Sequence, residues 1–147
     1  MMKAKKTNLI AAATLALLAL ALAAPPASAR YKANLQGHAC WLAEVTGELH
    51  DSYTCDLVRT GRWLPCGLDR DLYEAICAAE DCAERVHRAI ELRRPSRIVH
   101  RHICETRGTL DKAKSLACRC RISCCTRTLI TQADHILCLM EGRITNH

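Results

Sequence analysis

The chain has 147 residues and carries 21 lysine and arginine residues against 15 aspartate and glutamate residues, for a formal net charge of +6. Three of the basic residues are lysines within the first six positions. The rest of the chain is therefore only mildly basic, which argues against a nucleic-acid partner. Phenylalanine is absent and aromatic residues make up 3% of the chain, so the hydrophobic core is modest and cross-links are expected to contribute to its stability.

Residues 1–29 have the three parts of a secretory signal peptide. The early lysines give a positive start, residues 9–24 form an apolar run, and Ala27-Ser28-Ala29 supplies the small residues that a signal peptidase recognises. We therefore predict cleavage after Ala29, export from the cell, and one mature domain of residues 30–147. The alternative is a membrane anchor, which the short apolar run disfavours.

The first half of the mature chain predicts one clear helix. Residues 30–65 mix polar and apolar side chains without a clean period, which predicts short helical pieces and loops. After them, apolar residues recur at steps of three and four, as expected for one face of an α-helix. We predict that Asp69 or Asp71 caps this helix and that it ends at Arg93-Arg94-Pro95, because proline cannot continue a helix. The recurring residues are Leu72, Ile76, Ala79, Ala83, Val86 and Ile90.

The second half is predicted to be turn-rich over Pro95–Gly108, with helices over Thr109–Ala117 and Leu129–Met140. Alternating patterns typical of strands are scarce. The predicted fold class is therefore all-α, a small disulfide-rich helical domain. We interpret the apolar stripe from Leu72 to Ile90 as core rather than as a partner groove.

All eleven cysteines follow residue 39, within the predicted mature domain. Exported thiols are expected to form disulfides rather than to bind zinc, and spacing does not define which cysteines pair. Because the number is odd, one sulfur is left after five bridges, and we predict a disulfide-linked homodimer, with a single reactive thiol as the alternative. The cysteines are Cys40, Cys55, Cys66, Cys77, Cys82, Cys104, Cys118, Cys120, Cys124, Cys125 and Cys138.

The positions of two pairs of neighbouring cysteines argue against a disulfide bond within either pair. Cys77 and Cys82 lie five residues apart on one predicted helix and project in different directions, so each is expected to bridge to a different element. The vicinal Cys124 and Cys125 cannot easily bond to each other without strain, so they are expected to hold their segment in two directions.

Two segments resemble the insulin and relaxin superfamily, in particular its invertebrate members with extra cysteines. Leu64-Pro65-Cys66-Gly67 leads into the helix of Cys77 and is similar to the start of the family's B-chain. Cys124-Cys125-Thr126, followed by Cys138, is similar to its A-chain. The resemblance implies bonds from Cys66 to Cys125 and from Cys77 to Cys138, and a connecting peptide cut near Arg93-Arg94. Asp134 departs from the family pattern, which has a core leucine there.

A basic stretch between the predicted helices has three interpretations. It is a solvated loop, a region of proprotein processing at Arg93-Arg94, or a contact for an anionic partner such as a sulfated glycan or a membrane surface. In the last case histidines would strengthen binding at mildly acidic pH. The stretch consists of Arg93, Arg94, Arg97, His100, Arg101 and His102.

The sequence predicts a secreted, non-enzymatic ligand. No hydrolase motif is present, so we assign no catalytic, cofactor-binding or metal-binding residue and disfavour a secreted enzyme. A disulfide-stapled helical scaffold can present a few side chains to an extracellular receptor with little ordering cost, as a peptide hormone, growth-factor-like or venom-type polypeptide does. The alternative is a saposin-like module that binds lipid or a membrane surface.

Overall fold

The computed structural model describes residues 27–62 and 66–144. Most of the predicted signal peptide and two residues of the insulin-like segment, Leu64 and Pro65, lie outside the described residues. The chain divides into two units, Met1–Ala33 and Asn34–His147. The second unit holds the whole of the packed core.

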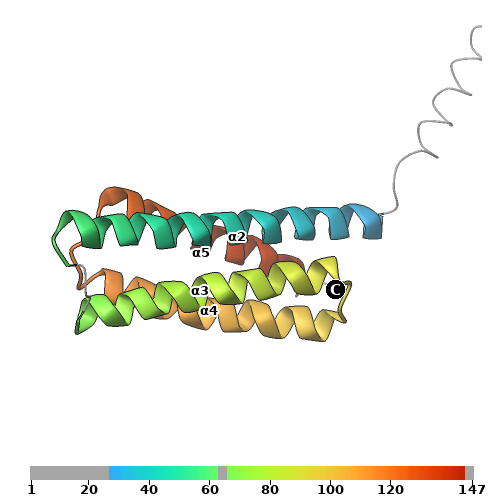
Figure 1. Ribbon diagram of the computed structural model, residues 1–147. Coiled ribbons are helices and arrows are strands. Elements are labelled where there is room, and N and C mark those ends of the chain that lie inside the picture. The colour runs from blue at the N-terminus through green and yellow to red at the C-terminus, as the bar shows by residue number, and fades with distance from the viewer. Residues whose placement is uncertain (1–26, 63–65, 145–147) are drawn as a thin grey trace, which may run out of the picture. The chain divides into compact units, whose positions relative to one another are not determined.

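This unit contains α2 (Ala27–Arg59) from Asn34 onward, and all of α3 (Leu68–Glu91), α4 (Ser96–Ala117) and α5 (Cys124–Ile144). Side-chain contacts join α2 to α3 and to α5, and join α4 to α5, while a short turn joins α3 to α4. Each helix runs antiparallel to the next (Figure 1). The described residues contain no strand, so the all-α prediction is confirmed, and the architecture is an up-down-up-down four-helix bundle.

The prediction for the first part of the mature domain was wrong. In place of short helical pieces and loops, residues 30–59 belong to one continuous helix, α2. Its buried residues recur at helical spacing, from Leu42 through Leu49 and Tyr53 to Leu57, and all face the core. The predicted cleavage position, Ala29, lies within the first turn of this helix.

The predicted helix after residue 68 is confirmed as α3, and its apolar stripe is buried except for Ile90, which is partly buried. Its start differs from the prediction. Gly67 precedes the helix with a φ of 56°, and neither Asp69 nor Asp71 caps it, because both already lie in its first turn. Both carboxylates still stabilise the start of α3, because the amino end of a helix carries partial positive charge.

The turn-rich stretch predicted after Pro95 was also wrong. Helix α4 begins at Ser96, directly after the proline, and runs through the whole segment. Its buried residues follow one another at steps of three and four, including Thr106, whose hydroxyl donates to the backbone oxygen of His102 at 2.8 Å. The last helix, α5, extends the predicted range at both ends.

The core is built from small and aliphatic side chains. Tyr53 is the largest fully buried side chain, with an exposed fraction of 0%. Its hydroxyl donates to the backbone oxygen of Asp69 at 3.2 Å, so it links α2 to the start of α3. Alanines at central positions of α3, among them Ala79 and Ala83, allow the helices to approach closely.

A buried carboxylate of α2 holds the start of α5. Asp56 is 3% exposed and accepts hydrogen bonds from the backbone N–H of Ser123 at 2.8 Å and from the hydroxyl of Thr126 at 2.7 Å. Arg59 donates to its other oxygen at 2.7 Å. Ser123 and Thr126 lie at the amino end of α5, where backbone N–H groups lack partners within the helix, whereas Arg59 belongs to α2 itself. Asp56 therefore holds the start of α5 from a neighbouring helix, while the hydroxyl of Ser123 caps α5 by accepting from the backbone N–H of Thr126 at 3.2 Å.

Ion pairs join α4 to α5 along their shared edge. Arg107 pairs with Asp134 and, at 2.9 Å, with Glu141, and Lys114 pairs with Asp134 at 2.7 Å. Asp134, which departs from the insulin pattern, is thus part of a helix–helix contact. Within residues 27–62 and 66–144, no helix offers a stretch that is both long and apolar enough to cross a bilayer.

Candidate functional site

The structure places most of the cysteines at the surface. The structure shows no disulfide between any two of the eleven; seven are exposed and Cys82 alone is buried. Unbridged cysteine behaves as a small apolar side chain and is usually found inside proteins. Seven exposed thiols on one small bundle are therefore unusual for a protein that keeps its cysteines reduced.

Six cysteines belong to one end of the bundle, which we call the Cys-rich end. There the α2–α3 connection meets the α4–α5 connection: the sulfur of Cys120 lies 3.6 Å from the backbone oxygen of Leu68, and Arg62 donates to the backbone oxygen of Arg121 at 3.1 Å. Bridges formed here would join connections that are far apart in the sequence. The Cys-rich end comprises Cys55, Cys66, Cys118, Cys120, Cys124 and Cys125.

The two bonds implied by the insulin resemblance differ in their placement. Cys66 and Cys125 both belong to the Cys-rich end and are exposed. Cys77 contacts α2, with its sulfur 3.8 Å from a ring nitrogen of His50, whereas Cys138 lies 3.4 Å from Arg107 of α4. The structure therefore places the second pair against different helices.

A thiol, an imidazole and a carboxylate come together between α2 and α3. Glu80 lies 2.9 Å from Nδ1 of His50, and the other ring nitrogen, Nε2, faces the sulfur of Cys77. The hydroxyl of Tyr73 is 3.1 Å from the same Nε2, and the two rings meet edge to face with centroids 5.4 Å apart. The sequence analysis missed this group, because His50 is 27 residues from Cys77 and only the packing of α2 on α3 brings them together.

The turn between α3 and α4 presents exposed arginines. Arg93 has a φ of 51°, in the left-handed region. Its N–H donates to the oxygen of Ile90 at 3.0 Å, and that of Arg94 donates to the oxygen of Ala89 at 2.9 Å. This is the Schellman ending of a helix, in which glycine is the usual residue at the left-handed position. An arginine in this left-handed conformation destabilises the folded protein by about 1 kcal/mol relative to glycine. The exposed side chain of Arg93 is therefore present despite a local loss of stability.

The predicted basic stretch divides into two parts. Arg93, Arg94 and Arg97 are exposed and form no ion pair with an acidic side chain among the described residues; we call these three the basic turn. Farther along α4, Arg101 and His102 both pair with Glu105, at 3.9 Å and 3.1 Å. The pairing with His102, together with nearby positive charge, lowers the pKa of Glu105. Only the first part offers unpaired positive charge.

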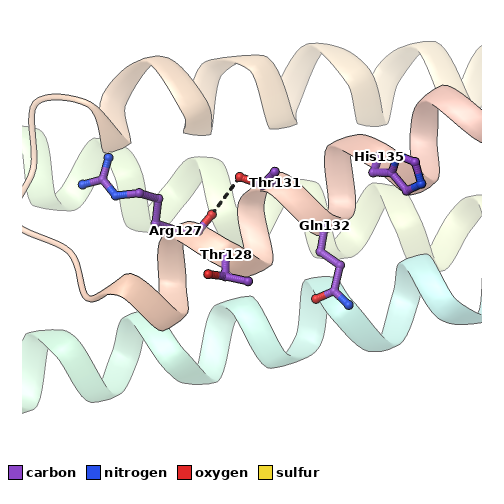
Figure 2. A pocket seen from close by; sticks show the side chains of 5 residues that line it. All are labelled: Arg127, Thr128, Thr131, Gln132 and His135. Carbon is purple, nitrogen blue, oxygen red and sulfur yellow. Dashed lines mark hydrogen bonds between the residues drawn. The ribbon is translucent and has the colours of Figure 1, made fainter.

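A shallow depression of about 460 Å³ lies on the outward face of α5. Figure 2 shows its five lining side chains, all from this one helix, with α4 and α2 on either side. Thr131 donates to the backbone oxygen of Arg127 at 3.1 Å. The lining holds no carboxylate or cysteine, so the depression offers no group for nucleophilic or acid–base chemistry other than His135.

The described residues contain no group of three or more His, Cys, Asp or Glu side chains arranged to hold a metal ion. No family model, curated protein or solved structure matches this chain. The class of protein is therefore defined by the fold alone: a small up-down-up-down helical bundle with most of its cysteines on the surface.

Proposed function

We propose that the protein is an exported, disulfide-stabilised helical ligand that binds an acidic extracellular receptor through the basic turn. The observation that carries the proposal is the arginine at position 93. A left-handed helix ending normally selects glycine, and residues held in such conformations concentrate at functional sites. Here the strained residue is also the first of three exposed, unpaired cations.

The distribution of cysteines supports export and bridging. Exposed thiols in an oxidising compartment become cross-links, and each bridge that closes a long loop stabilises the fold by about 2–4 kcal/mol. The Cys-rich end is the part of the bundle where such bridges would join distant segments. The basic turn lies at the opposite end of α3, so bridging leaves it accessible to a receptor.

Removing the arginine side chains of the basic turn is expected to weaken binding without weakening the fold. Arg93→Gly relieves the left-handed conformation and should stabilise the protein by about 1 kcal/mol. Combined with Arg94→Gln and Arg97→Gln, it should reduce binding of labelled protein to responsive cells by about tenfold and flatten the salt dependence. Lys112→Gln, an exposed cation elsewhere on α4, is the control and should bind normally.

Unchanged cell binding by the triple variant would contradict the proposal. Anionic vesicles form a second arm of the experiment, because the saposin-like alternative predicts co-sedimentation at low salt. Vesicle binding together with unchanged cell binding would favour that alternative.

The insulin-like maturation hypothesis makes a separate prediction at the same turn. A protease can reach Arg93-Arg94, because residues 91–97 are all exposed. Cleavage there would separate α3 from α4 and leave two chains joined by disulfides. Mass spectrometry of the secreted protein, before and after reduction, should then show two fragments that separate only on reduction. An intact chain of residues 30–147 after reduction would remove the maturation hypothesis while leaving receptor binding untouched.

A further inference from the structure

The group formed by Cys77, His50 and Glu80 has the order of a nucleophile, its base and the group that orients the base. Because the carboxylate of Glu80 accepts from Nδ1, the ring proton is held on that nitrogen. Nε2 is then an acceptor, and it faces both the hydroxyl of Tyr73, at 3.1 Å, and the thiol of Cys77, at 3.8 Å. This is the arrangement by which an imidazole activates a thiol or hydroxyl in proteins. The proposed binding of a receptor by the basic turn does not involve Cys77, His50 or Glu80.

No cysteine of α2 lies level with Cys77 along the bundle. Cys77 meets α2 at His50, from which Cys55 and Cys40 lie about 7.5 Å and 15 Å along the helix axis, at a rise of 1.5 Å per residue. A disulfide requires two Cα atoms within about 7 Å, and the lateral separation of the helices adds to these distances. Cys82, on the same helix as Cys77, is buried and accepts a hydrogen bond from Arg85 at 2.8 Å.

We propose that Cys77 is the cysteine left unpaired by five intramolecular bridges, and that it forms a mixed disulfide with a low-molecular-weight thiol supplied as its disulfide. The thiol gives its proton to Nε2 of His50 as the Cys77 sulfur attacks one sulfur of the small disulfide. The new sulfur–sulfur bond forms as the old one breaks, and the leaving thiolate takes the proton from the imidazolium. One thiol and one disulfide are consumed and one of each is produced, so the step needs no further oxidant.

The surroundings of the sulfur explain why a base is required. Burial raises the pKa of the Cys77 thiol, and the carboxylates of Glu80 and Asp81 raise it further, while the hydroxyl of Tyr73 acts in the opposite direction. With His50 from α2, these are the titratable groups that the structure places around the sulfur. The thiol is therefore protonated at neutral pH, and reaction there depends on proton transfer to His50.

The first test maps the modification on secreted wild-type protein. After incubation with oxidised glutathione, peptide mapping should find one glutathione, attached to Cys77, and five bridges among the other ten cysteines. Finding Cys77 in a bridge within the chain, or glutathione on another cysteine instead, would overturn the proposal. So would a Cys77–Cys77 bond between two chains, which would appear as a doubled mass on non-reducing electrophoresis and would instead support the homodimer prediction.

The second test measures the role of the imidazole. His50→Gln should slow the reaction with oxidised glutathione at pH 7 by about tenfold or more, and Glu80→Gln by a smaller factor, because Glu80 acts only by positioning His50. His38→Gln is the matched control: this histidine is also on α2, and its Nδ1 bonds to the backbone oxygen of Asn34 in its own helix, so the rate should not change. Circular dichroism of each variant establishes that the helices are intact.

The pH dependence of the reaction rate distinguishes a chemical role of His50 from a structural role. At neutral pH, the rate in wild type should exceed the rate in His50→Gln, because the imidazole takes the proton of the thiol as the sulfur attacks. In His50→Gln, the rate should follow the thiolate fraction alone and keep rising into the alkaline range, because the pKa of Cys77 is raised. Identical pH–rate profiles for wild type and His50→Gln would overturn the role assigned to His50.

Discussion

Asp56→Ala is expected to destabilise the bundle by about 2–4 kcal/mol at pH 7. The substitution removes a buried acceptor and leaves the backbone N–H of Ser123 and the hydroxyl of Thr126 without their charged partner. It also removes the contacts that hold the amino end of α5 against α2, so that end of the helix should pack less firmly on the bundle. Urea unfolding followed by circular dichroism measures the loss. Asp51→Ala, at an exposed position of the same helix, is the control and should change stability by less than about 0.5 kcal/mol.

The loss of stability in Asp56→Ala should also depend on pH, and it should be smaller in acid. Burial alone would raise the pKa of Asp56, but the N–H of Ser123 and the hydroxyl of Thr126 hold it below its usual value. A carboxyl whose pKa is lower in the folded state contributes its full stability above the unfolded value of about 3.9 and loses it as the pH falls through the folded value. The difference between wild type and Asp56→Ala should therefore narrow below about pH 4. A difference that stays constant down to pH 2 would contradict the role assigned to the carboxylate.

Tyr53→Ala should cost about 3–5 kcal/mol, the range for removing a large buried aromatic side chain. The effect is large because this is the largest fully buried side chain of a core otherwise made of aliphatic residues and alanine. Tyr53→Phe keeps the ring and removes only the hydroxyl that donates to Asp69, so it should cost about 1 kcal/mol.

Trp41→Ala is the control for side-chain size, because Trp41 is 40% exposed and its loss opens no cavity. Thermal unfolding of the three variants should rank them Tyr53→Ala, Tyr53→Phe and Trp41→Ala in decreasing order of destabilisation. Equal losses for the alanine and phenylalanine variants at position 53 would show that the ring does not fill the core as the structure indicates.

The sequence predicted the all-α class and located α3 well, because its apolar stripe is unbroken and a proline follows it. It failed for α2 and for the first part of α4, residues 96–108, for identifiable reasons, whereas the predicted helix over Thr109–Ala117 is confirmed. In α2, polar residues and Gly47 interrupt the apolar pattern, yet they are accommodated within a helix whose buried face packs on the core. In α4, a threonine occupies a core position and interrupts the apolar pattern, and its hydroxyl is satisfied by the helix backbone. Packing outweighed local propensity in both helices.

The sequence predicted less of the candidate site than of the fold. Residue spacing shows that Glu80 and Cys77 share one side of α3, because they are three residues apart. It does not show that His50 lies opposite them, since this depends on the register of α2 against α3. The basic turn was recognised from composition, but the left-handed conformation of Arg93 was not, because arginine carries no signal for it.

The order of the helices along the chain has a consequence for oxidation. Each helix packs beside its successor across a short connection, so contacts are mostly local, and bundles of this kind fold in microseconds to milliseconds. Forming and reshuffling sulfur–sulfur bonds takes seconds to hours. We therefore expect a chain emerging into an oxidising compartment to reach its helical arrangement first. Proximity in that finished arrangement, and not cysteine order along the polypeptide, would then select which sulfurs are joined.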